Sequence, residues 1–446
     1  MILVATAALL AAATPSPLPA FPGAEGAGAL SVGGRGGRVL RVTNLDDSGP
    51  GSLRAAVEAQ GPRTVIFDIG GTIQLSKPLV VRHGQITIAG QTAPGGGITL
   101  RDYVFEIAAD DVVVRYIRSR LGDESKVESD AFTISRGRRI IVDHVSAGWS
   151  VDETLSSGSS YKTPRDDLRD VTVQWSIIAE SLRKSLHAKG EHGYGSLLRG
   201  ARGARMSFHH NLWAHHSARM PRPGNYLTAA QDNVGAYYDF RSNVFYNWGG
   251  GRSGYNADSG DKASLAAYNF VNNAYKTGAD SNRPIAFEDS NPIAKAWFAG
   301  NSMDGVVPAD PWSLVSGRTD AAYRLAGPVR FPAITRDPAP RAFEKVLAGA
   351  GASLARDPVD ARVVQSVRAG TGRLIDSQKD VGGWPRLAPG TPWQDRDGDG
   401  MPDAWERRHR LDPADPADGN SDRDRDGFTN VEEWLNSLVS SKRRPA

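Results

Sequence analysis

Acidic residues with a regular spacing near the C-terminus could bind a hard metal ion. The stretches "DRDGDGMPDAWE" and "DRDRDGFTNVEE" both match the calcium loop, in which alternating acids, a turning glycine and a final glutamate bring oxygens around one ion. The predicted ligands are Asp395, Asp397, Asp399, Asp403 and Glu406 in the first loop, and Asp422, Asp424, Asp426, Asn430 and Glu433 in the second. A solvated acidic run would not also place Gly400 and Gly427 at the turn of both copies. We therefore expect a small EF-hand-like module that binds Ca2+.

A second set of acids and arginines is spread over the middle of the chain. It comprises Glu128 and Asp130 in "ESDAFTI", Asp152 and Glu153 in "VDHVSAGWSVDET", and Arg219 and Arg222 in "HHSARMPRPG". Carboxylates that share one place repel each other unless a cation joins them, and arginine binds carboxylates through a two-pronged hydrogen bond. This set would suit a divalent cation and an anionic substrate, provided that the fold brings the segments together.

The charge of the chain is divided in a way that agrees with both sets. Residues 394–436 contain 13 acidic and 6 basic residues, a net charge of −7, so the rest carries +10 of the total of +3. A basic body indicates a polyanionic partner, either a nucleic acid or an acidic polysaccharide, and an acidic tail indicates cations. The chain has no cysteine, which excludes disulfides and thiolate metal sites.

The elements that must position these residues form a degenerate repeat. Seven alternating segments, from "VVVRYIRS" to "AWFAGNSM", align at Ile117, Val145, Ser176, Asn211, Asn243, Asn273 and Asn301, with steps of 28, 31, 35, 32, 30 and 28 residues. Four consecutive members place Asn at the aligned position, and stacked Asn side chains can hydrogen-bond along an axis at a bend with left-handed backbone. The pattern predicts an all-β fold, a right-handed parallel β-helix. An antiparallel β-sandwich, whose strands also alternate, is the alternative.

A parallel solenoid would solve the positioning problem. Strands of successive coils lie about 4.8 Å apart, so acids tens of residues apart in sequence can share one outer face with Arg219. Ca2+ held by Asp130 and Asp152 would then offset the repulsion between the two carboxylates.

Four regions are expected along the chain. Residues 1–20 are apolar with a small, proline-broken end and predict a signal peptide cleaved near Ala20, hence a secreted protein. Residues 21–307 form the β-helix, and residues 308–390, which contain helical patterns, are expected to cap the open end of the solenoid. Residues 391–446 hold the two calcium loops and a tail. No other apolar run approaches the length of a membrane span, and we expect a monomer.

The body resembles the pectate lyases of polysaccharide lyase family 1. The resemblance covers about residues 21–305 and rests on "FPGAEGAGA", "VTNLDDSGPGSLRAAV", "ITIAGQTAPGGGITLR", "IIVDHVSAGWSVDET" and "SFHHNLWAHHSARMPR", of which the last two are the most specific. It implies a right-handed parallel β-helix, dependence on Ca2+, and cleavage of polygalacturonate by β-elimination. The paired acidic loops resemble dockerin-type or thrombospondin-type calcium repeats, which implies a structural role or an anchor to a cell surface or another protein.

The resemblance also assigns roles to residues. The calcium ligands of the family fall on Glu128, Asp130 and Asp152; a further acid of the family falls on Gly148, and Glu153 is expected to take its place. The essential arginine falls on Arg219. Substrate-binding residues fall on Arg222 and, on the intervening coil, on Lys184, with Lys189 as a rival.

The chemistry of a uronate explains these residue types. Removal of the C5 proton builds negative charge beside the sugar carboxylate, which a divalent cation can offset. The ordinary pKa of arginine exceeds 12, so two roles stay open for Arg219. Either it is the base at alkaline pH, as the resemblance favours, or it stabilises charge while water or hydroxide takes the proton.

Other functions fit the residues less well. "HHNLWAHH" looks like a zinc site, but alternate strand residues face opposite sides and no acid completes the set, while Asp143 and His144 are expected to hold a turn. A polygalacturonase-like hydrolase on the same fold would need paired acids at the scissile bond, and a non-catalytic protein could bind an acidic glycan through Arg219. Nucleic acid is the least favoured partner, because no aromatic-basic recognition motif is present.

Overall fold

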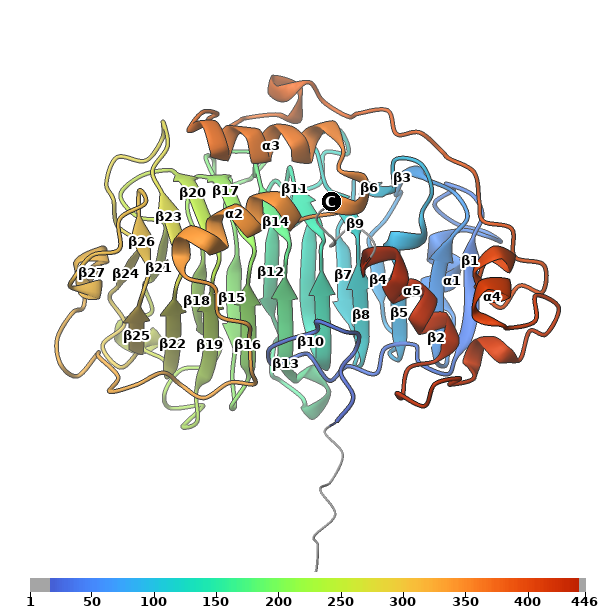
Figure 1. Cartoon of the computed structure of the whole chain (residues 1–446). Coiled ribbons are helices and arrows are strands. Elements are labelled where there is room, and N and C mark those ends of the chain that lie inside the picture. The colour runs from blue at the N-terminus through green and yellow to red at the C-terminus, as the bar shows by residue number, and fades with distance from the viewer. Residues whose placement is uncertain (1–16, 441–446) are drawn as a thin grey trace, which may run out of the picture.

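The computed structural model describes residues 17–440 and folds them into a parallel β-solenoid with three faces (Figure 1). The first sheet contains β1 (Arg38–Val42), β2 (Arg63–Phe67), β5 (Ile86–Ala89), β8 (Val112–Arg115), β10 (Phe132–Asp143), β13 (Leu168–Gln174), β16 (Arg205–His209), β19 (Ala236–Arg241), β22 (Ala266–Val271) and β25 (Lys295–Ala299), in that order. Every pairing between them is parallel, which confirms the predicted architecture over the sandwich.

Two further faces complete each coil. The second sheet contains β3 (Gly71–Gln74), β6 (Ile98–Arg101), β9 (Ile117–Arg120), β11 (Ser146–Gly148), β14 (Ile177–Ala179), β17 (Leu212–His216), β20 (Val244–Trp248), β23 (Ala274–Lys276) and β26 (Ser302–Met303). The third face contains β4 (Leu79–Val81), β7 (Phe105–Ala108), the first half of β10, β12 (Leu155–Gly158), β15 (Leu197–Gly200) and β18 (Arg222–Asn225), followed by β21 (Gly254–Asn256), β24 (Phe287–Asp289) and β27 (Val315–Gly317). Since β27 pairs with β24, the solenoid continues past the predicted boundary at residue 307.

The alignment of the repeat is confirmed by the register of the second sheet. The residues that follow the aligned positions pair in one continuous row, from Ser146 through Ile177, Leu212, Val244 and Ala274 to Ser302. Within the row of aligned residues, Asn243 Nδ2 donates to Asn273 Oδ1 at 3.0 Å, and Asn243 Oδ1 accepts from Asn211 Nδ2 at 3.1 Å. The left-handed residue is the one before the asparagine, for example His210 with φ 54° and Ser242 with φ 53°, and not the asparagine itself.

The interior is filled by side chains that stack from coil to coil. Phe208, Phe240, Phe270 and Phe298 form one such column, with ring centroids 5.3, 4.9 and 4.7 Å apart in sequence order. At the N-terminal end, helix α1 (Leu53–Glu58) buries Leu53 and Val57 against this core. At the other end Trp312 and Tyr323 pack against it.

The helices between residues 308 and 390 do not cap an end of the solenoid, which corrects the expectation. Helices α2 (Ala339–Gly349) and α3 (Pro358–Ala369) lie across the second sheet, where Val346 and Val363 share a core with residues of β14, β17 and β20 (Figure 1). Asp357 and Asp360 of this region pair with buried Arg120 at 2.6 and 2.7 Å. The outer side of the second sheet is apolar along β14, β17 and β20, so it needs a lateral cover there.

The chain then returns along the solenoid to its first coils (Figure 1). Leu182 forms a β-bridge with Ile375, Gly96 N–H donates to Ala388 C=O at 2.8 Å, and Gly70 N–H donates to Pro389 C=O at 2.9 Å. The C-terminal module, with α4 (Asp403–His409) and α5 (Asn430–Ser440), packs on the first sheet beside β2 and β5. It is thus part of the same body and not a module on a free linker.

The predicted signal peptide lies outside the described residues except for Pro17 to Ala20. Ala20 packs with Phe21 on Val113 and Ile141 of the first sheet. Within residues 17–440, no helix combines the length and apolar character that crossing a membrane requires.

Candidate active site and acidic loops

The third face places one predicted acid from each of two coils in register. β10 and β12 pair Phe132 with Leu155, so Asp130 and Glu153 stand at equivalent positions two residues before each strand. The next two coils continue this row with bridges from Glu153 to Tyr194 and from Tyr194 to Ala218, the neighbour of Arg219. Four stretches that are far apart in the sequence therefore meet at one edge of the solenoid.

The three acids Asp130, Asp152 and Glu153 form a compact cluster. Each contributes one carboxylate oxygen to a group whose atoms all lie within 4.8 Å of one another. Asp130 accepts from Glu153 N–H at 3.1 Å and from Thr133 Oγ1 at 2.9 Å. Burial and the charge of Asp152 raise the pKa of Asp130 to about 7. Asp130 therefore needs a further positive charge nearby to stay fully ionised near neutral pH.

Two histidines that the sequence analysis missed flank this cluster. His192 Nε2 lies 2.7 Å from Asp152 Oδ1, and His187 Nε2 lies 3.6 Å from the same oxygen, with the two rings stacked at 3.6 Å. Burial alone would raise the pKa of Asp152, but the hydrogen bond and charge of His192, with help from His187 and Arg219, lower it. His187 Nδ1 accepts from Lys189 N–H at 3.1 Å, which leaves Nε2 as a donor toward the acids.

Glu128 and Lys184 lie at the margin of the site. Glu128 accepts from Ala188 N–H at 2.7 Å and lies 3.4 Å from His187 Nε2, so it is tied to the loop of the histidines rather than to Asp130. Lys184 Nζ pairs with Glu191 at 3.1 Å, and both side chains are exposed. The structure therefore brings Asp130, Asp152, Glu153 and Arg219 together, with Glu128 beyond the histidines and Lys184 on the outer surface of the same loop.

Arg219 is held from two sides. Its guanidinium contacts the Glu153 carboxylate and lies over the ring of Tyr194, 4.3 Å from the centroid. The backbone of Arg219 is left-handed, with φ 61°, and this conformation turns the side chain back over the preceding coil. The ring of Tyr194 also packs on His192 at 3.8 Å, so one stack connects Arg219 with the histidines at Asp152.

Further cations follow along the same face. Arg222 lies 5.2 Å from the ring centroid of Tyr255 and 3.8 Å from Asp258, and Arg252 lies on the same ring at 4.7 Å. Beside Tyr194 a groove of about 410 Å³ extends toward Gly249 and Asp280. Arg219, Arg222 and Arg252 therefore follow one another along this face, and Arg183 borders the groove, which suits an extended polyanion.

The residues of the histidine-rich strand β17 and its neighbours have structural partners. His210 pairs with Asp337 at 3.1 Å, His215 with Ser366 at 2.8 Å, and His216 with Ser181 at 2.7 Å. Asp143 likewise accepts from Arg115 and His144 at 2.9 and 2.8 Å, far from the acid cluster in the fold, on the first sheet. These contacts support the structural role expected for Asp143 and His144.

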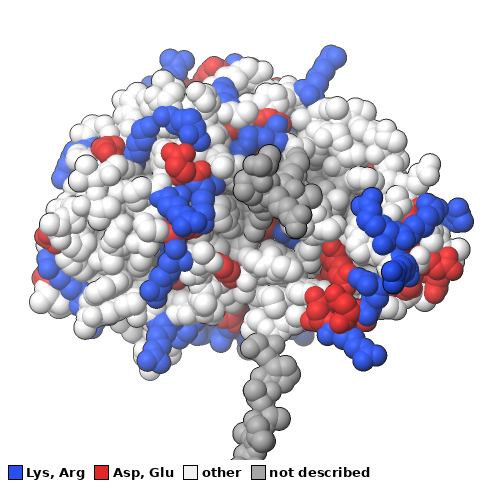
Figure 2. All heavy atoms as spheres, in the orientation of Figure 1, with Lys and Arg blue, Asp and Glu red and all other residues white. Residues whose placement is uncertain are grey.

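The first acidic loop brings its side chains together with one acid from outside it. Asp395, Asp397 and Asp399 form one group with oxygens within 4.8 Å, and Asp399, Glu406 and Asp418 form a second. Burial, followed by the charges of the neighbouring acids, raises the pKa of Glu406 to about 8 and that of Asp399 to about 7. Acidic side chains gather on the side of the molecule that carries α4 and α5 (Figure 2).

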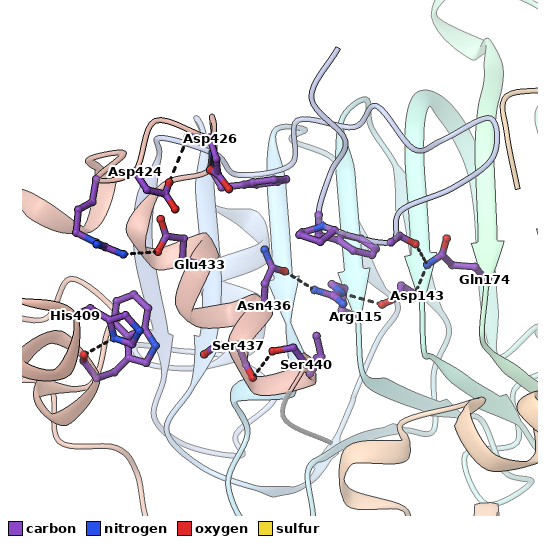
Figure 3. A pocket seen from close by; sticks show the side chains of 17 residues that line it. Arg115, Asp143, Gln174, His409, Asp424, Asp426, Glu433, Asn436, Ser437 and Ser440 are labelled. Carbon is purple, nitrogen blue, oxygen red and sulfur yellow. Dashed lines mark hydrogen bonds and ion pairs between the residues drawn. The ribbon is translucent and has the colours of Figure 1, made fainter. Parts of the chain in front are cut away.

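The second loop is more exposed. Asp422, Asp424 and Asp426 form a group within 4.8 Å, while Glu433 lies 3.5 Å from Arg423. It borders a cavity of about 470 Å³ between α5 and the first sheet, where Asn436 accepts from Arg115 at 3.2 Å (Figure 3). The ninth residues of the loops, Asp403 and Asn430, each accept from a backbone N–H of their own loop, a hydrogen bond that shapes the loop.

The chemistry of the donor sets fits calcium. In the first loop, and in the group of Asp130, Asp152 and Glu153, the ligands are carboxylates, which hard cations prefer. Asp152 also belongs to a second group with His187 and His192, whose imidazoles suit a transition metal better than calcium. Within residues 17–440, buried oxygens of Asp399, Glu406 and Asp418 have no hydrogen-bond partner. Buried carboxylates of this kind need a cation or a proton.

Comparisons with known proteins agree with this chemistry, although no protein-family model matches the chain. The probable pectate lyase C of Aspergillus fumigatus is 38% identical over 449 residues, covering 99% of this chain and 98% of that protein. The protein of the same name from Aspergillus flavus is 38% identical over 434 residues, covering 96% and 95%. That of Emericella nidulans is 37% identical over 429 residues, covering 94% and 93%.

Solved structures show the same fold at lower identity. The cedar pollen allergen jun a 1 has a TM-score of 0.53 at 17% identity, covering 74% of this chain and 92% of its own. A pectate lyase from Bacillus sp. N165, solved in complex with trigalacturonate, has a TM-score of 0.50 at 15% identity, covering 73% and 98%. Since relatives 38% identical over nearly their whole length carry the same name, the chain belongs to the pectate lyase family.

Proposed function

We propose that this pectate lyase cleaves polygalacturonate by calcium-assisted β-elimination at the edge of the third face. The observation that carries the proposal is the cluster of Asp130, Asp152 and Glu153 in direct contact with Arg219. Acids next to an arginine, with Arg222 and Arg252 farther along the same face, fit an anionic sugar chain better than a neutral one.

Asp130, Asp152 and Glu153 would hold the calcium ion. Bound there, calcium would bind the carboxylate of the sugar and offset the charge that develops when the C5 proton leaves. His187 and His192 orient Asp152 through their Nε2 atoms, and Glu153 orients Arg219. Glu128 would act as a more distant ligand, reached by a shift of the loop that contains His187.

Arg219 would stabilise charge in the transition state. Arg219 contacts the Glu153 carboxylate, and a charged guanidinium in this place can donate to a sugar carboxylate but cannot accept a proton. In this arrangement water or hydroxide takes the C5 proton, and the glycosidic oxygen at C4 leaves with its bonding electrons to give an unsaturated uronide. This role differs from the base that the family resemblance favours.

Arg222 and Lys184 would bind carboxylates of neighbouring sugars. Arg222 is confined by Tyr255 and Asp258, and so offers its charge at a fixed place, whereas exposed Lys184 would bind less selectively. A de-esterified substrate fits this site, because an esterified uronate has no charged carboxylate to offer a cation.

The two acidic loops would each bind calcium in a structural role. The packing of α4 and α5 on the first sheet favours stabilisation of the body over an anchor to a surface or another protein. Export is proposed from the apolar residues 1–20, and N-terminal sequencing of secreted protein should then begin near Phe21. Elution of the secreted protein at about 45–50 kDa would support the proposed monomer, given a mass of 47.8 kDa for the whole chain.

A digest of polygalacturonate tests the proposed reaction. The expected result is a rise in ultraviolet absorbance from unsaturated uronides in parallel with new reducing ends, and loss of both with Asp130→Asn or Asp152→Asn. Reducing ends without absorbance would indicate a hydrolase. Binding of polygalacturonate without any cleavage would indicate a glycan-binding protein.

A further inference from the structure

We propose that Asp418, which lies between the two acidic loops, completes the calcium site of the first loop, and that this site is a clasp that fastens the C-terminal module to the first coils. The inference deepens the proposal that the loops bind calcium and rests on it. It assigns a ligand outside the loop motif and a purpose for the ion.

The position of Asp418 carries the first part. One oxygen each of Asp399, Glu406 and Asp418 lies within 4.8 Å of the other two, although Asp418 follows the loop by twelve residues. Glu406 is 0% exposed, and within the described chain neither of its oxygens has a hydrogen-bond partner. Asp418 Oδ1 and Asp399 Oδ2 are buried without a partner in the same way. Three carboxylates thus direct unpaired oxygens at one place.

The backbone around Asp418 fits closely over the loop. A Cβ atom on Gly419 would lie 2.4 Å from Asp399 Oδ2, so any larger residue would push the Asp399 carboxylate away. Asp418 C=O accepts from Asn430 Nδ2 at 2.8 Å, and Ser421 C=O accepts from Asn430 N–H at 2.8 Å. The start of α5 therefore holds Asp418 against the first loop, and this explains why position 9 of the second loop is Asn.

The first loop is in direct contact with the solenoid, and this contact supports the second part of the proposal, that the calcium site fastens the C-terminal module. Asp395 Oδ2 accepts from Arg41 of β1 at 2.5 Å, and Arg41 also pairs with Asp68 at 2.8 Å. Met401 and Trp405, both in the second half of the loop, share a core with Ile66 and Ala89 of the first sheet. An ion in this loop fixes the residues that touch the solenoid.

The clasp follows a long extended segment, residues 375–390, which we call the strap. Residues 375–390 cross the second sheet and meet the body at Leu182, Gly96 and Gly70 through backbone contacts. Where the strap passes the active site, Arg183 pairs with Asp376 at 3.1 Å and borders the groove beside Tyr194. Release of the clasp would free the strap from one end, and through it the wall of the groove.

Thermal unfolding of Asp418→Asn tests the ligand, with Asp415→Asn as the matched control because exposed Asp415 lies three residues away and outside the cluster. All proteins carry Asp152→Asn, so that the active-site ion does not contribute. We expect the parent and Asp415→Asn to lose about 5 °C or more in chelator. In dilute calcium the melting temperature of Asp418→Asn should be lower than that of the Asp415→Asn control. It should return to the control value when the calcium concentration is raised roughly tenfold or more.

Two outcomes separate the proposals. Equal calcium dependence of Asp418→Asn and Asp415→Asn would overturn the role of Asp418 while leaving calcium binding by the loops intact. If the melting temperature of the parent protein, Asp152→Asn alone, does not change with calcium, the proposal that the loops bind calcium is itself overturned.

Proteolysis of the folded protein tests the clasp. Mass spectrometry should show cuts within residues 387–394 in chelator, and equally in Asp418→Asn at dilute calcium, before the solenoid is cut. If chelation lowers the melting temperature without exposing this segment, the ion stabilises the module alone and the clasp is refuted.

Discussion

Glu153 and Arg219, from coils that are not adjacent in sequence, are in direct contact at the edge of the third face. Glu153 belongs at the same time to the acid cluster with Asp130 and Asp152. One carboxylate therefore connects the proposed calcium site with the proposed charge stabiliser, so the two should not be separable by mutation.

Glu153→Gln should affect both functions. Because the amide is a poorer ligand and a poorer partner for Arg219, we expect the calcium concentration for half-maximal activity to rise about tenfold or more and kcat to fall roughly 10- to 100-fold. Glu128→Gln is the matched control and should change the calcium dependence only about two- to threefold, since it lies beyond His187. Equal effects of the two substitutions would show that Glu153 is not a ligand.

Arg219→Lys should distinguish a charge stabiliser from a base. If Arg219 stabilises charge, kcat should fall roughly 100- to 1,000-fold while the alkaline rise of kcat/KM stays at the same pH. If Arg219 is the base, the rise should move down by about 2 pH units, because the ordinary pKa of lysine is near 10.4. The pH profile of kcat/KM at saturating calcium provides the comparison, and a downward shift would contradict the proposed role.

Asp360→Ala should destabilise the whole protein without touching the chemistry. Asp360 is buried, pairs with Arg120 at 2.7 Å and accepts from Ser146 Oγ at 2.6 Å, so its removal leaves a buried guanidinium short of a partner. We expect a loss of about 3–5 kcal/mol in the free energy of unfolding. Glu344→Ala, which breaks an exposed pair with Arg368, should cost less than about 1 kcal/mol in the same urea titration.

The asparagine ladder shows why the solenoid could be predicted from the sequence. An aligned residue that bonds to its equivalent in the next coil must recur once per coil, as Asn211, Asn243 and Asn273 do, whatever the intervening loops contain. The regular repeat also predicts that the acids and Arg219, which come from different coils, lie close together. The strands of the third face could not be predicted, because strands such as β12 and β15 are four residues long and contain no residue type that recurs in every coil.

Other features depended on contacts that no spacing reveals. His187 and His192 lie in an irregular loop, so only the fold shows that both rings face Asp152. The pattern of residues 339–369 predicts an apolar helical face but not the surface that this face covers, which is the side of the solenoid and not its end. Asp418 lies outside the loop motif in sequence, and only the fold shows that its neighbour Gly419 packs closely against Asp399 of the loop.

Asp289 should make stability depend on pH. Burial raises the pKa of Asp289 to about 7 from its ordinary 3.8, so the folded state holds this proton more tightly than the unfolded state. The contribution of Asp289 to the free energy of unfolding is therefore most favourable below about pH 4 and declines as the pH rises to about 7. Above that pH, Asp289 destabilises the folded state by at most on the order of 4 kcal/mol. Asp289→Asn, which keeps the acceptor for Asn291 N–H, should raise the melting temperature at pH 8 and leave it nearly unchanged at pH 4. A gain of the same size at both pH values would refute the titration of Asp289.

The most direct test is a crystal structure of Arg219→Lys with calcium and tetragalacturonate bound. We expect one calcium ion between Asp130 and Asp152, in contact with a sugar carboxylate, with residue 219 donating to that carboxylate and the C5–H of the sugar open to water. Calcium bound elsewhere, or a sugar chain on another face of the solenoid, would contradict the account.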